Sequence, residues 1–400
     1  MKNLGREVAV LGVGMHPFGK YPDKSLIGLG THAVREALKD ASLEWKDIQA
    51  VAGGNSDIWG GVVGRHPGQY LAKAMGFTGI PIVNTGGACA TGGVCISTIA
   101  NMVATGAIDI GMAVGMDIAP KGFFAVGQMD KEPTKDDTGF LEFRVAGAPN
   151  PAYWAFECVK RMEQYGTTMD DLNMSKVVVS RHSVFNPMAR FQKVYTKEEV
   201  EASPMVNYPF RLLTLCATSD GSAAVILGSV EEARKHTSNP IILAAASVGS
   251  PVYDDPTLRL GQISAPAKNG PLVSESVMGV KRAYEMAGMG PDDISFFEIP
   301  DNSSWHYLVY TDVVLQAEVG TAEKLLRSGD TAIGGKRPIN PSGGFASLGE
   351  VYPAQGEAQV YEMTTQLRGQ AGQRQVEGAK TALATVYGGE GNNAVVILKK

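Results

Sequence analysis

Residues 80–105 of the chain read IPIVNTGGACATGGVCISTIANMVAT. The apolar run at 80–84 predicts a buried strand, and two pairs of glycines on either side of Cys89 follow it without a break. From Val94 to Thr105 the residues are small and apolar on all sides, which is typical of a buried helix. This stretch therefore predicts a strand, a glycine-rich turn and a helix, the unit from which an α/β sheet is built.

The flanking segments repeat this alternation of strands and helices. Residues 25–41 have apolar residues at helical spacing, with Ser25 as the candidate N-cap. Apolar runs predict strands at 8–13, 48–52, 108–115, 219–227, 241–246, 295–299 and 394–398. We therefore expect an α/β protein with a parallel, doubly wound sheet.

The second half of the chain echoes the first. Residues 34–51 align without gaps with residues 280–297, and in both segments a helix leads to an Asp-Ile pair that opens a strand. This repeat predicts two halves, one formed by residues 1–118 with 207–240 and one by 241–400. Between them, residues 119–206 contain more charge and methionine and include a stretch without periodicity, so we interpret them as an inserted loop domain.

Composition excludes several classes of protein. The 400 residues include 36 Lys and Arg against 41 Asp and Glu, so a basic face for nucleic acid is not expected. Because 18 consecutive apolar residues occur nowhere, we expect no membrane span and no membrane partner. The four cysteines form neither a CxxC pair nor a zinc-ligand spacing, which predicts a reduced, cytoplasmic protein without a metal site.

Cys89 is the first candidate for chemistry. It lies where a buried strand turns into a buried helix, and a thiol at a helix N-terminus is expected to have a lowered pKa. The glycines around it would let a substrate reach the sulfur and let backbone N–H groups face a developing charge. The alternative is a small buried apolar residue, which is what most free cysteines are.

Four segments together resemble the thiolase superfamily. They are NTGGACATG at 84–92, residues 186–227, INPSGG at 339–344 and LRGQAGQRQVEGA at 367–379. The similarity is greatest to the sterol-carrier-protein and archaeal branch. It implies a duplicated five-layer α-β-α-β-α fold with Cys89 as the nucleophile and coenzyme A as cosubstrate, without a permanently bound cofactor. It also implies a homodimer and a small zinc-ribbon/OB-fold (DUF35) partner.

The chain departs from that branch at its acid/base residues. Residues 300–303 read Pro-Asp-Asn-Ser where the branch has His-Asp-(Cys or Ala)-Phe, and Glu350 stands where a second histidine activates the cysteine. Near the C-terminus, residues 386–388 read Val-Tyr-Gly in place of Cys-x-Gly or Asn-x-Gly. Glu350 can act as a base if burial raises its pKa, and Tyr352 can exchange a proton if its pKa is lowered. Alternatively, Glu350 and Tyr352 only hold the loop.

The resemblance implies CoA-dependent cleavage of a carbon–carbon bond in a specialised 3-ketoacyl-CoA. Cys89 would accept the acyl group, and the backbone N–H groups of Cys89 and Gly388 would form an oxyanion hole. Similarity to benzoylsuccinyl-CoA thiolases suggests an aromatic acyl group. One alternative is retro-aldol cleavage of a 3-hydroxyacyl-CoA such as a steroid side-chain ester, because Gly-Glu-x-Tyr at 349–352 also resembles thiolase-fold aldolases. The other is a thiolase-like subunit that is only a scaffold.

Other polar residues are weaker candidates. His306 can reach inward or pack in an aromatic cluster, and His66 lies in a loop. An arginine in or beside the insertion can pair with a CoA phosphate or a substrate carboxylate. These candidate arginines are Arg144, Arg190 and Arg211. Beside the terminal glycine loop, Tyr387 and Glu390 are further possible acids.

Overall fold

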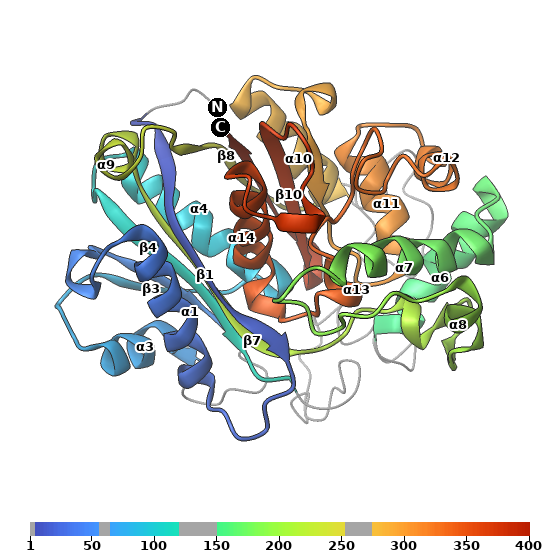
Figure 1. Ribbon diagram of the computed structural model, residues 1–400, viewed down its shortest axis with the longest axis horizontal. Helices are drawn as coiled ribbons and strands as arrows, with labels where there is room; N and C mark the ends of the chain where they lie inside the picture. Colours follow the sequence, from blue (N-terminus) through green and yellow to red (C-terminus); the bar gives the residue numbers. More distant parts are fainter. Residues whose placement is uncertain (1–4, 56–64, 120–149, 253–273) are drawn as a thin grey trace.

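The structure is a computed structural model that describes residues 5–55, 65–119, 150–252 and 274–400. Its centre is a sheet with the strand order β3-β2-β4-β7-β1-β8-β11-β10-β9 (Figure 1). The N-terminal half contributes β1 (Val8–Gly19), β2 (Val51–Gly54), β3 (Ile82–Thr85), β4 (Ile110–Asp117) and β7 (Asp220–Ser229). The C-terminal half contributes β8 (Ile241–Gly249), β9 (Phe296–Glu298), β10 (Thr381–Gly388) and β11 (Asn392–Lys399).

The strand order shows the duplication that the sequence predicts. β1 and β8 pair at the junction, and outward from it the order β1-β7-β4-β2-β3 is matched by β8-β11-β10-β9. A single parallel bridge between Ile339 and Phe297 then occupies the place of β3 beside β2. The INPSGG segment therefore corresponds in position to the strand and turn that lead to Cys89.

The sheet is mixed, so the expected parallel sheet is wrong. β2 pairs in parallel with β3 and β4, but β7 is antiparallel to both β4 and β1. β4 and β7 are antiparallel neighbours although residues 118–219 separate them in the chain, and Asp117 pairs with Gly221 where the chain leaves and re-enters the sheet. In the second half, β10 and β11 form the matching antiparallel pair, a hairpin with a short turn. Antiparallel neighbours need no crossover helix, which is why strand–helix alternation did not reveal them.

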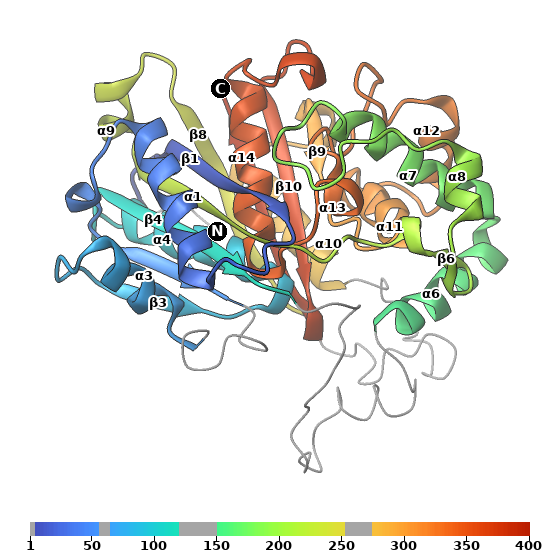
Figure 2. The same cartoon turned by 60° about the horizontal axis from the view of Figure 1, so that its bottom comes forward.

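Helices complete the five layers that the resemblance implies. α1 (Leu26–Ala41) and α3 (Pro67–Met75) cover the outer face of the first half, and α10 (Ser274–Ala287) packs on β8 and β11. α4 (Thr91–Ala104) and α14 (Gln355–Leu367) contact each other as the central layer (Figure 2). α4 contacts β4 and β2, whereas α14 contacts β7 and β10, so the two central helices join the halves.

Local sequence explains how these elements begin. Ser25 caps α1 by accepting a hydrogen bond from the Gly28 amide at 3.1 Å, as expected. The aligned repeat is also visible in the turns that precede β2 and β9. Asp47 accepts from the Glu44 amide and Asp293 from the Gly290 amide, each at 2.8 Å. The same aspartate cap therefore turns the chain from helix to strand in both halves.

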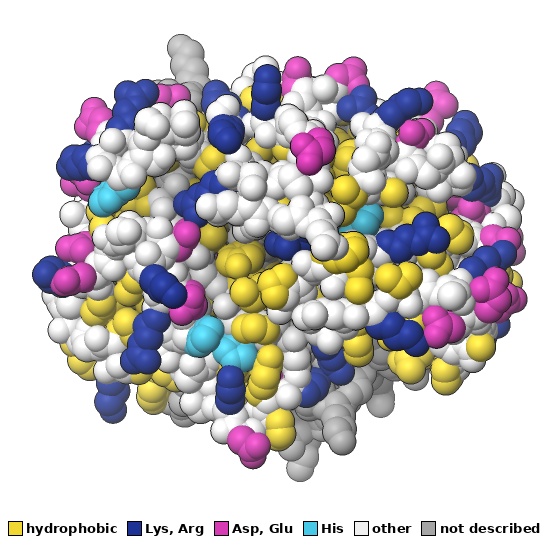
Figure 3. Space-filling model, viewed as in Figure 1, with side chains coloured by type: hydrophobic (Ala, Val, Ile, Leu, Met, Phe, Trp, Pro, Cys, Tyr) yellow, Lys and Arg dark blue, Asp and Glu magenta, His cyan; other side chains and the backbone are white. Residues whose placement is uncertain are grey.

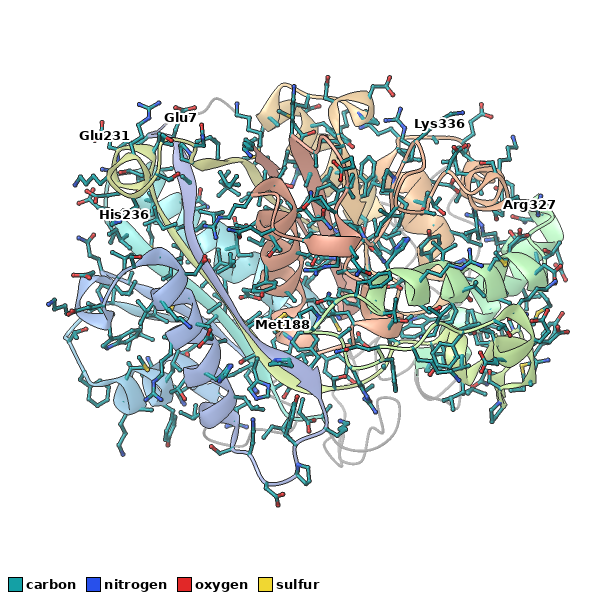
Figure 4. All side chains as sticks on the ribbon, in the orientation of Figure 1. Glu7, Met188, Glu231, His236, Arg327 and Lys336 are labelled. Carbon is teal, nitrogen blue, oxygen red and sulfur yellow. The ribbon has the colours of Figure 1, made fainter. Side chains whose placement is uncertain are left out.

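A helical region lies beside the sheet, at the right of Figure 1. It contains α6 (Asn150–Tyr165), α7 (Met169–Ser183), α8 (Lys197–Ala202), α11 (Ser304–Val314) and α12 (Thr321–Ser328), with the hairpin of β5 (Met205–Asn207) and β6 (Phe210–Arg211). Buried Arg161 on α6 pairs with Asp312 at 2.7 Å and Glu323 at 2.8 Å. Arg327, labelled at the right edge of Figure 4, holds α7 through Asp171 at 2.6 Å.

The limits 119–206 proposed for the inserted domain stay a prediction, because residues 120–149 lie outside the described ranges. Met188, labelled near the centre of Figure 4, accepts a hydrogen bond from the Phe18 amide at 3.0 Å through its carbonyl oxygen. The segment after α7 is thus attached to β1. Among the helices of the described residues, none has the length and apolar character that a membrane crossing requires.

Candidate active site

The candidate residues meet at the carboxyl ends of several strands. Cys89 follows the end of β3, Asp117 ends β4, Asn302 follows β9 and Gly388 ends β10. The two halves meet here, because the turn at Ala88–Ala90 packs against β10 and against the turn Tyr352–Ala354. In open α/β sheets this edge is where ligands bind.

Cys89 lies in the turn between β3 and α4. Ala88 has a φ of +49°, a conformation that few residues other than glycine adopt, and Thr91 donates a hydrogen bond to the Ala88 carbonyl at 2.6 Å. The cysteine is partly exposed, whereas Cys95, Cys158 and Cys216 are buried. The backbone of this tight turn therefore places one of the four cysteines at a partly exposed position.

The structure does not support the lowered pKa expected for this thiol. Burial raises the pKa of Cys89, and the carboxylates of Glu350 and Asp117 raise it further. The sulfur is enclosed by protein atoms although the residue keeps some exposure, so loss of solvation and negative charge outweigh the helix N-terminus. The resting form is a thiol, and a base must remove its proton before it can attack.

Glu350 is the titratable group best placed as that base. Its side chain is fully buried, and Oε1 accepts hydrogen bonds from Asn302 Nδ2 and, at 2.8 Å, from Gln355 Nε2. Oε2 receives no hydrogen bond that meets ordinary geometry. Burial raises the pKa of Glu350 to about 7, although the donors Cys216, Asn302 and Gln355 lower it. The burial condition under which Glu350 can serve as a base is thus met.

The backbone fixes Glu350 between the two halves. Its amide donates to the Ala217 carbonyl at 2.8 Å, and its carbonyl accepts from the Ser219 amide at 2.7 Å. The preceding Gly349 has a φ of +110°, which an L side chain rarely adopts. Residues 217–219 lead into β7, so the N-terminal half anchors a residue that belongs to the C-terminal half.

Tyr352 lies close to Glu350 but does not have the lowered pKa that a basic role requires. Burial raises the pKa of its phenol, and the charges of Glu350, Cys216 and Cys89 raise it further. A phenol with a raised pKa keeps its proton, so at neutral pH Tyr352 can donate a hydrogen bond but not accept a proton. The raised pKa therefore fits a hydrogen-bond donor and not a base.

Gly388 approaches the Cys89 turn closely. A Cβ at this position would lie 2.0 Å from the Gly87 carbonyl oxygen and 2.9 Å from the Ala90 nitrogen. Only glycine fits such a contact between two backbones. The end of β10 is thus next to the first residues of the nucleophile turn, where an oxyanion hole of Cys89 and Gly388 amides would form.

Amide and carboxyl groups follow the position of the missing histidine, which is Pro300 in this chain. Asn302, two residues further on, donates to Glu350, while Asp301 accepts from the Phe345 amide at 2.5 Å. Sequence reasoning missed Asn302, Gln355, Cys216 and Asp117 as neighbours of the candidate base and nucleophile. Only Asp117 has a recognisable signal, a polar residue directly after an apolar strand.

The weaker candidates that the structure describes have other contacts. His306 packs in an aromatic cluster, 4.7 Å from the Trp154 ring and 4.6 Å from the Trp305 ring, and burial lowers its pKa to about 3. Tyr387 lies at the edge of this cluster, 6.1 Å from His306. Arg190 donates to the Thr218 carbonyl, Arg211 donates to the Ser203 carbonyl at 2.9 Å, and His66 is exposed at the start of α3. Arg144 and the side chain of Glu390 lie outside the described residues.

The charge pattern of the site and surface limits other roles. In the described part of the chain, groups of three or more His, Cys, Asp or Glu side chains that could hold a metal ion do not occur. Figure 3 shows acidic and basic side chains interspersed over the visible face. The chemistry that the arrangement supports is proton transfer between a buried carboxyl and a thiol, beside backbone amides that can face a developing negative charge.

Comparison with known proteins identifies the family. Residues 8–119 match the thiolase N-terminal domain, and residues 266–400 match the thiolase C-terminal domain-like family. An acetyl-CoA acetyltransferase of Methanothermobacter thermautotrophicus is 32% identical over 393 residues, which cover 98% of each chain. The chain belongs to the thiolase family, and its relatives support an acyltransferase-type enzyme.

Two further proteins show the range of this family. The benzoylsuccinyl-CoA thiolase subunit BbsB of Thauera aromatica is 31% identical over 395 residues, 96% of each chain. The solved structure of the Ltp2-ChsH2(DUF35) aldolase superimposes with a TM-score of 0.84 and covers 100% of this chain and 99% of its own, at 22% identity. This similarity confirms the fold and leaves the reaction to be argued from the site.

Proposed function

We propose that the protein is a thiolase that cleaves a specialised 3-ketoacyl-CoA with coenzyme A through an acyl-Cys89 intermediate. The observation that supports this most directly is the placement of Glu350. A fully buried carboxyl with a pKa of about 7 lies near enough to the Cys89 thiol for its charge to oppose the ionisation of that thiol. The two groups therefore form a coupled pair in which one proton is shared.

The reaction begins when Cys89 passes its proton to Glu350 and attacks the 3-keto carbon. The oxyanion that forms faces the amides of Cys89 and Gly388, and its collapse breaks the carbon–carbon bond. The leaving acyl-CoA enolate takes the proton back from Glu350, with the Tyr352 hydroxyl as a hydrogen-bond donor. Coenzyme A, deprotonated by Glu350, then attacks the thioester and releases the second acyl-CoA and the Cys89 sulfur, which regains the proton.

The acyl group is proposed to be aromatic. The support is the relationship to BbsB, whose name specifies benzoylsuccinyl-CoA, and the loss of both histidines of ordinary thiolases. The protein is further proposed to act as a homodimer with a small OB-fold (DUF35) subunit. β3 is the edge strand of the sheet, and Val83 on it and Phe77 before it are 36% and 68% exposed. An apolar edge next to the nucleophile turn suits pairing with a second copy.

Retro-aldol cleavage of a 3-hydroxyacyl-CoA is the second candidate. The raised pKa of the Cys89 thiol favours it, because a lyase would leave that thiol unused. Glu350 would then take the proton of the substrate hydroxyl while the carbon–carbon bond breaks to give an enolate and a carbonyl compound.

Trapping the acyl group separates the two reactions. Acetoacetyl-CoA and benzoylsuccinyl-CoA are incubated with the enzyme without free coenzyme A, and the Cys89 peptide is analysed by mass spectrometry after acid quench. A thiolase gives an acylated peptide, and Cys89→Ser lowers turnover at least ~10³-fold because a hydroxyl lacks the acidity and leaving ability of sulfur. Cys95→Ser, a buried thiol on the adjoining helix, is the control.

A lyase gives a different pattern. Turnover of the 3-hydroxyacyl-CoA would continue in Cys89→Ser, and iodoacetamide would have little effect on it. Retention of more than a tenth of the wild-type thiolysis rate by Cys89→Ser contradicts the proposed function. A chain without turnover of either substrate class, alone and with its OB-fold subunit, would be a scaffold.

A further inference from the structure

Lys176 is a buried lysine that contacts the turn leading to the candidate base. Its side chain on α7 is among the largest fully buried ones, and lysine is rarely buried without a partner. The Nζ atom donates to the Ala346 carbonyl at 2.5 Å and to Ser347 Oγ at 2.8 Å. It also lies 5.0 Å from the centre of the Tyr195 ring, a favourable place for a cation.

Asp301 holds the same turn from its other end. The carboxylate accepts from the Phe345 amide at 2.5 Å and the Ala346 amide at 3.5 Å. α13 (Gly344–Ser347) therefore contacts the Asp301 carboxylate through amides near its start, and Lys176 through the Ala346 carbonyl and the Ser347 hydroxyl near its end. This arrangement matches the polarity of the turn. Three residues after it the chain reaches Glu350, so the pair fixes the backbone that presents the base.

Lys176 and Asp301 also interact through charge. Burial lowers the pKa of Lys176 to about 7, and the charge of Asp301 opposes that shift. Burial raises the pKa of Asp301 to about 7, and this shift is opposed first by the backbone amides that donate to the carboxylate and then by the charge of Lys176. Asp301 in turn raises the pKa of Glu350. The other titratable groups that act on Glu350 or respond to it are Cys216, Cys89 and Tyr352, and Glu298 responds to Asp301.

We propose that Lys176 is a positioning residue for Glu350, which it serves by holding the turn 344–347 and by keeping Asp301 negatively charged beside the base. This role rests on the proposed function of Glu350 as the proton acceptor. A negative Asp301 makes it harder for Glu350 to ionise, so the carboxyl keeps its proton close to neutral pH and can exchange it with Cys89. Lys176 touches no reacting atom in this scheme.

The test measures how Cys89 and Glu350 share a proton when no substrate is bound. The rate of Cys89 alkylation by iodoacetamide is followed at the Cys89 peptide between pH 5 and 9. Its logarithm rises with pH and flattens where Glu350 loses its proton, because the new carboxylate opposes the thiolate. Glu350→Gln should show no such bend, which identifies the group that causes it.

Lys176→Met removes the cation and leaves the size of the side chain nearly unchanged. Without the ammonium, Asp301 keeps its proton at neutral pH and stops opposing Glu350, so the bend should move down by about one pH unit. Asp301→Asn should move the bend in the same direction. Adding Lys176→Met to Asp301→Asn should move it no further, because the lysine acts through the aspartate.

Two results overturn the proposal. One is a bend at the wild-type pH in Lys176→Met, with a lowered melting temperature, which would be the signature of a merely structural lysine. The other is that Lys176→Met moves the bend as far in the Asp301→Asn protein as it does in the wild type. If Lys176→Met does not fold, Asp301→Asn decides alone, and an unmoved bend refutes the mechanism. Failure of the proposed function is distinguishable, since it appears as turnover in Cys89→Ser and leaves the alkylation profile intact.

Discussion

Glu350→Gln tests whether the buried carboxyl shares its proton near neutral pH. A carboxyl whose pKa is raised in the folded protein binds its proton more tightly there than in the unfolded chain. The stability that this contributes is present below the unfolded value of 4.5 and is lost as the pH rises through about 7. Glutamine does not titrate, so the variant should lack this pH dependence.

The size of the effect follows from the two pKa values. A rise from 4.5 to about 7 makes wild-type folding less favourable at pH 8 than at pH 5 by about 2.5 kcal/mol. Relative to wild type, Glu350→Gln should therefore gain about 2.5 kcal/mol between these pH values. For a chain of 400 residues that corresponds to ~3 °C in melting temperature. Any constant cost of placing an amide beside Asn302 and Gln355 cancels in the comparison.

The assay is urea and thermal unfolding of both proteins at pH 5, 6, 7 and 8. Glu231→Gln on α9 (Val230–His236), an exposed carboxylate labelled at the surface in Figure 4, is the control for replacing a carboxylate by an amide. The same Glu350→Gln protein should form acyl-Cys89 ~10²–10⁴-fold more slowly, the usual contribution of a general base. A stability difference that stays constant from pH 5 to 8 would show that Glu350 does not titrate in this range.

Two further predictions concern the nucleophile turn and the sheet edge. Gly388→Ala should lower turnover ~10²-fold or more without unfolding the protein, because its Cβ would push the Gly87 carbonyl, 2.0 Å away, and displace the oxyanion amides. Gly290→Ala, whose Cβ would meet only Asp293 at 4.0 Å, is the matched control, and equal rates in both variants would argue against the oxyanion hole. Sedimentation should show a homodimer, and Val83→Glu on the exposed edge of β3 should give monomers. A wild-type monomer would contradict the proposed pairing.

Sequence patterns predicted the elements and their duplication well. Apolar residues at helical spacing, with Ser25 as the cap, correctly predicted α1. The aligned segments 34–51 and 280–297 form the same helix–turn–strand unit in both halves. The direction of the strands was harder to predict from the sequence. β7 re-enters the sheet after a long insertion, and no local sequence pattern specifies whether it runs parallel or antiparallel to β4. The segment near Cys89 could be recognised because strand, turn and helix are contiguous there.

The electrostatics of the site could not be predicted in the same way. The sequence placed Cys89 at a helix N-terminus, which favours a thiolate, but the opposing carboxylates of Glu350 and Asp117 come from distant segments. Lys176 shows the same difficulty, since its partners Asp301 and Ala346 lie far along the chain. A pKa depends on the sum of burial and charge in three dimensions, which a linear motif does not contain.

The duplication described above has a consequence for how this molecule can fail. The turn after β3 presents the thiol, and the segment after the Ile339 bridge, its counterpart in the other copy, leads to Glu350. In the proposed reaction, each half of the duplicated chain therefore supplies one of the two groups that exchange the proton. The two groups stay close together only while the central helices α4 and α14 and the paired strands β1 and β8 hold the halves in place. We therefore expect that activity depends on how the two halves pack, and that on heating or in denaturant it is lost before the helices and strands unfold.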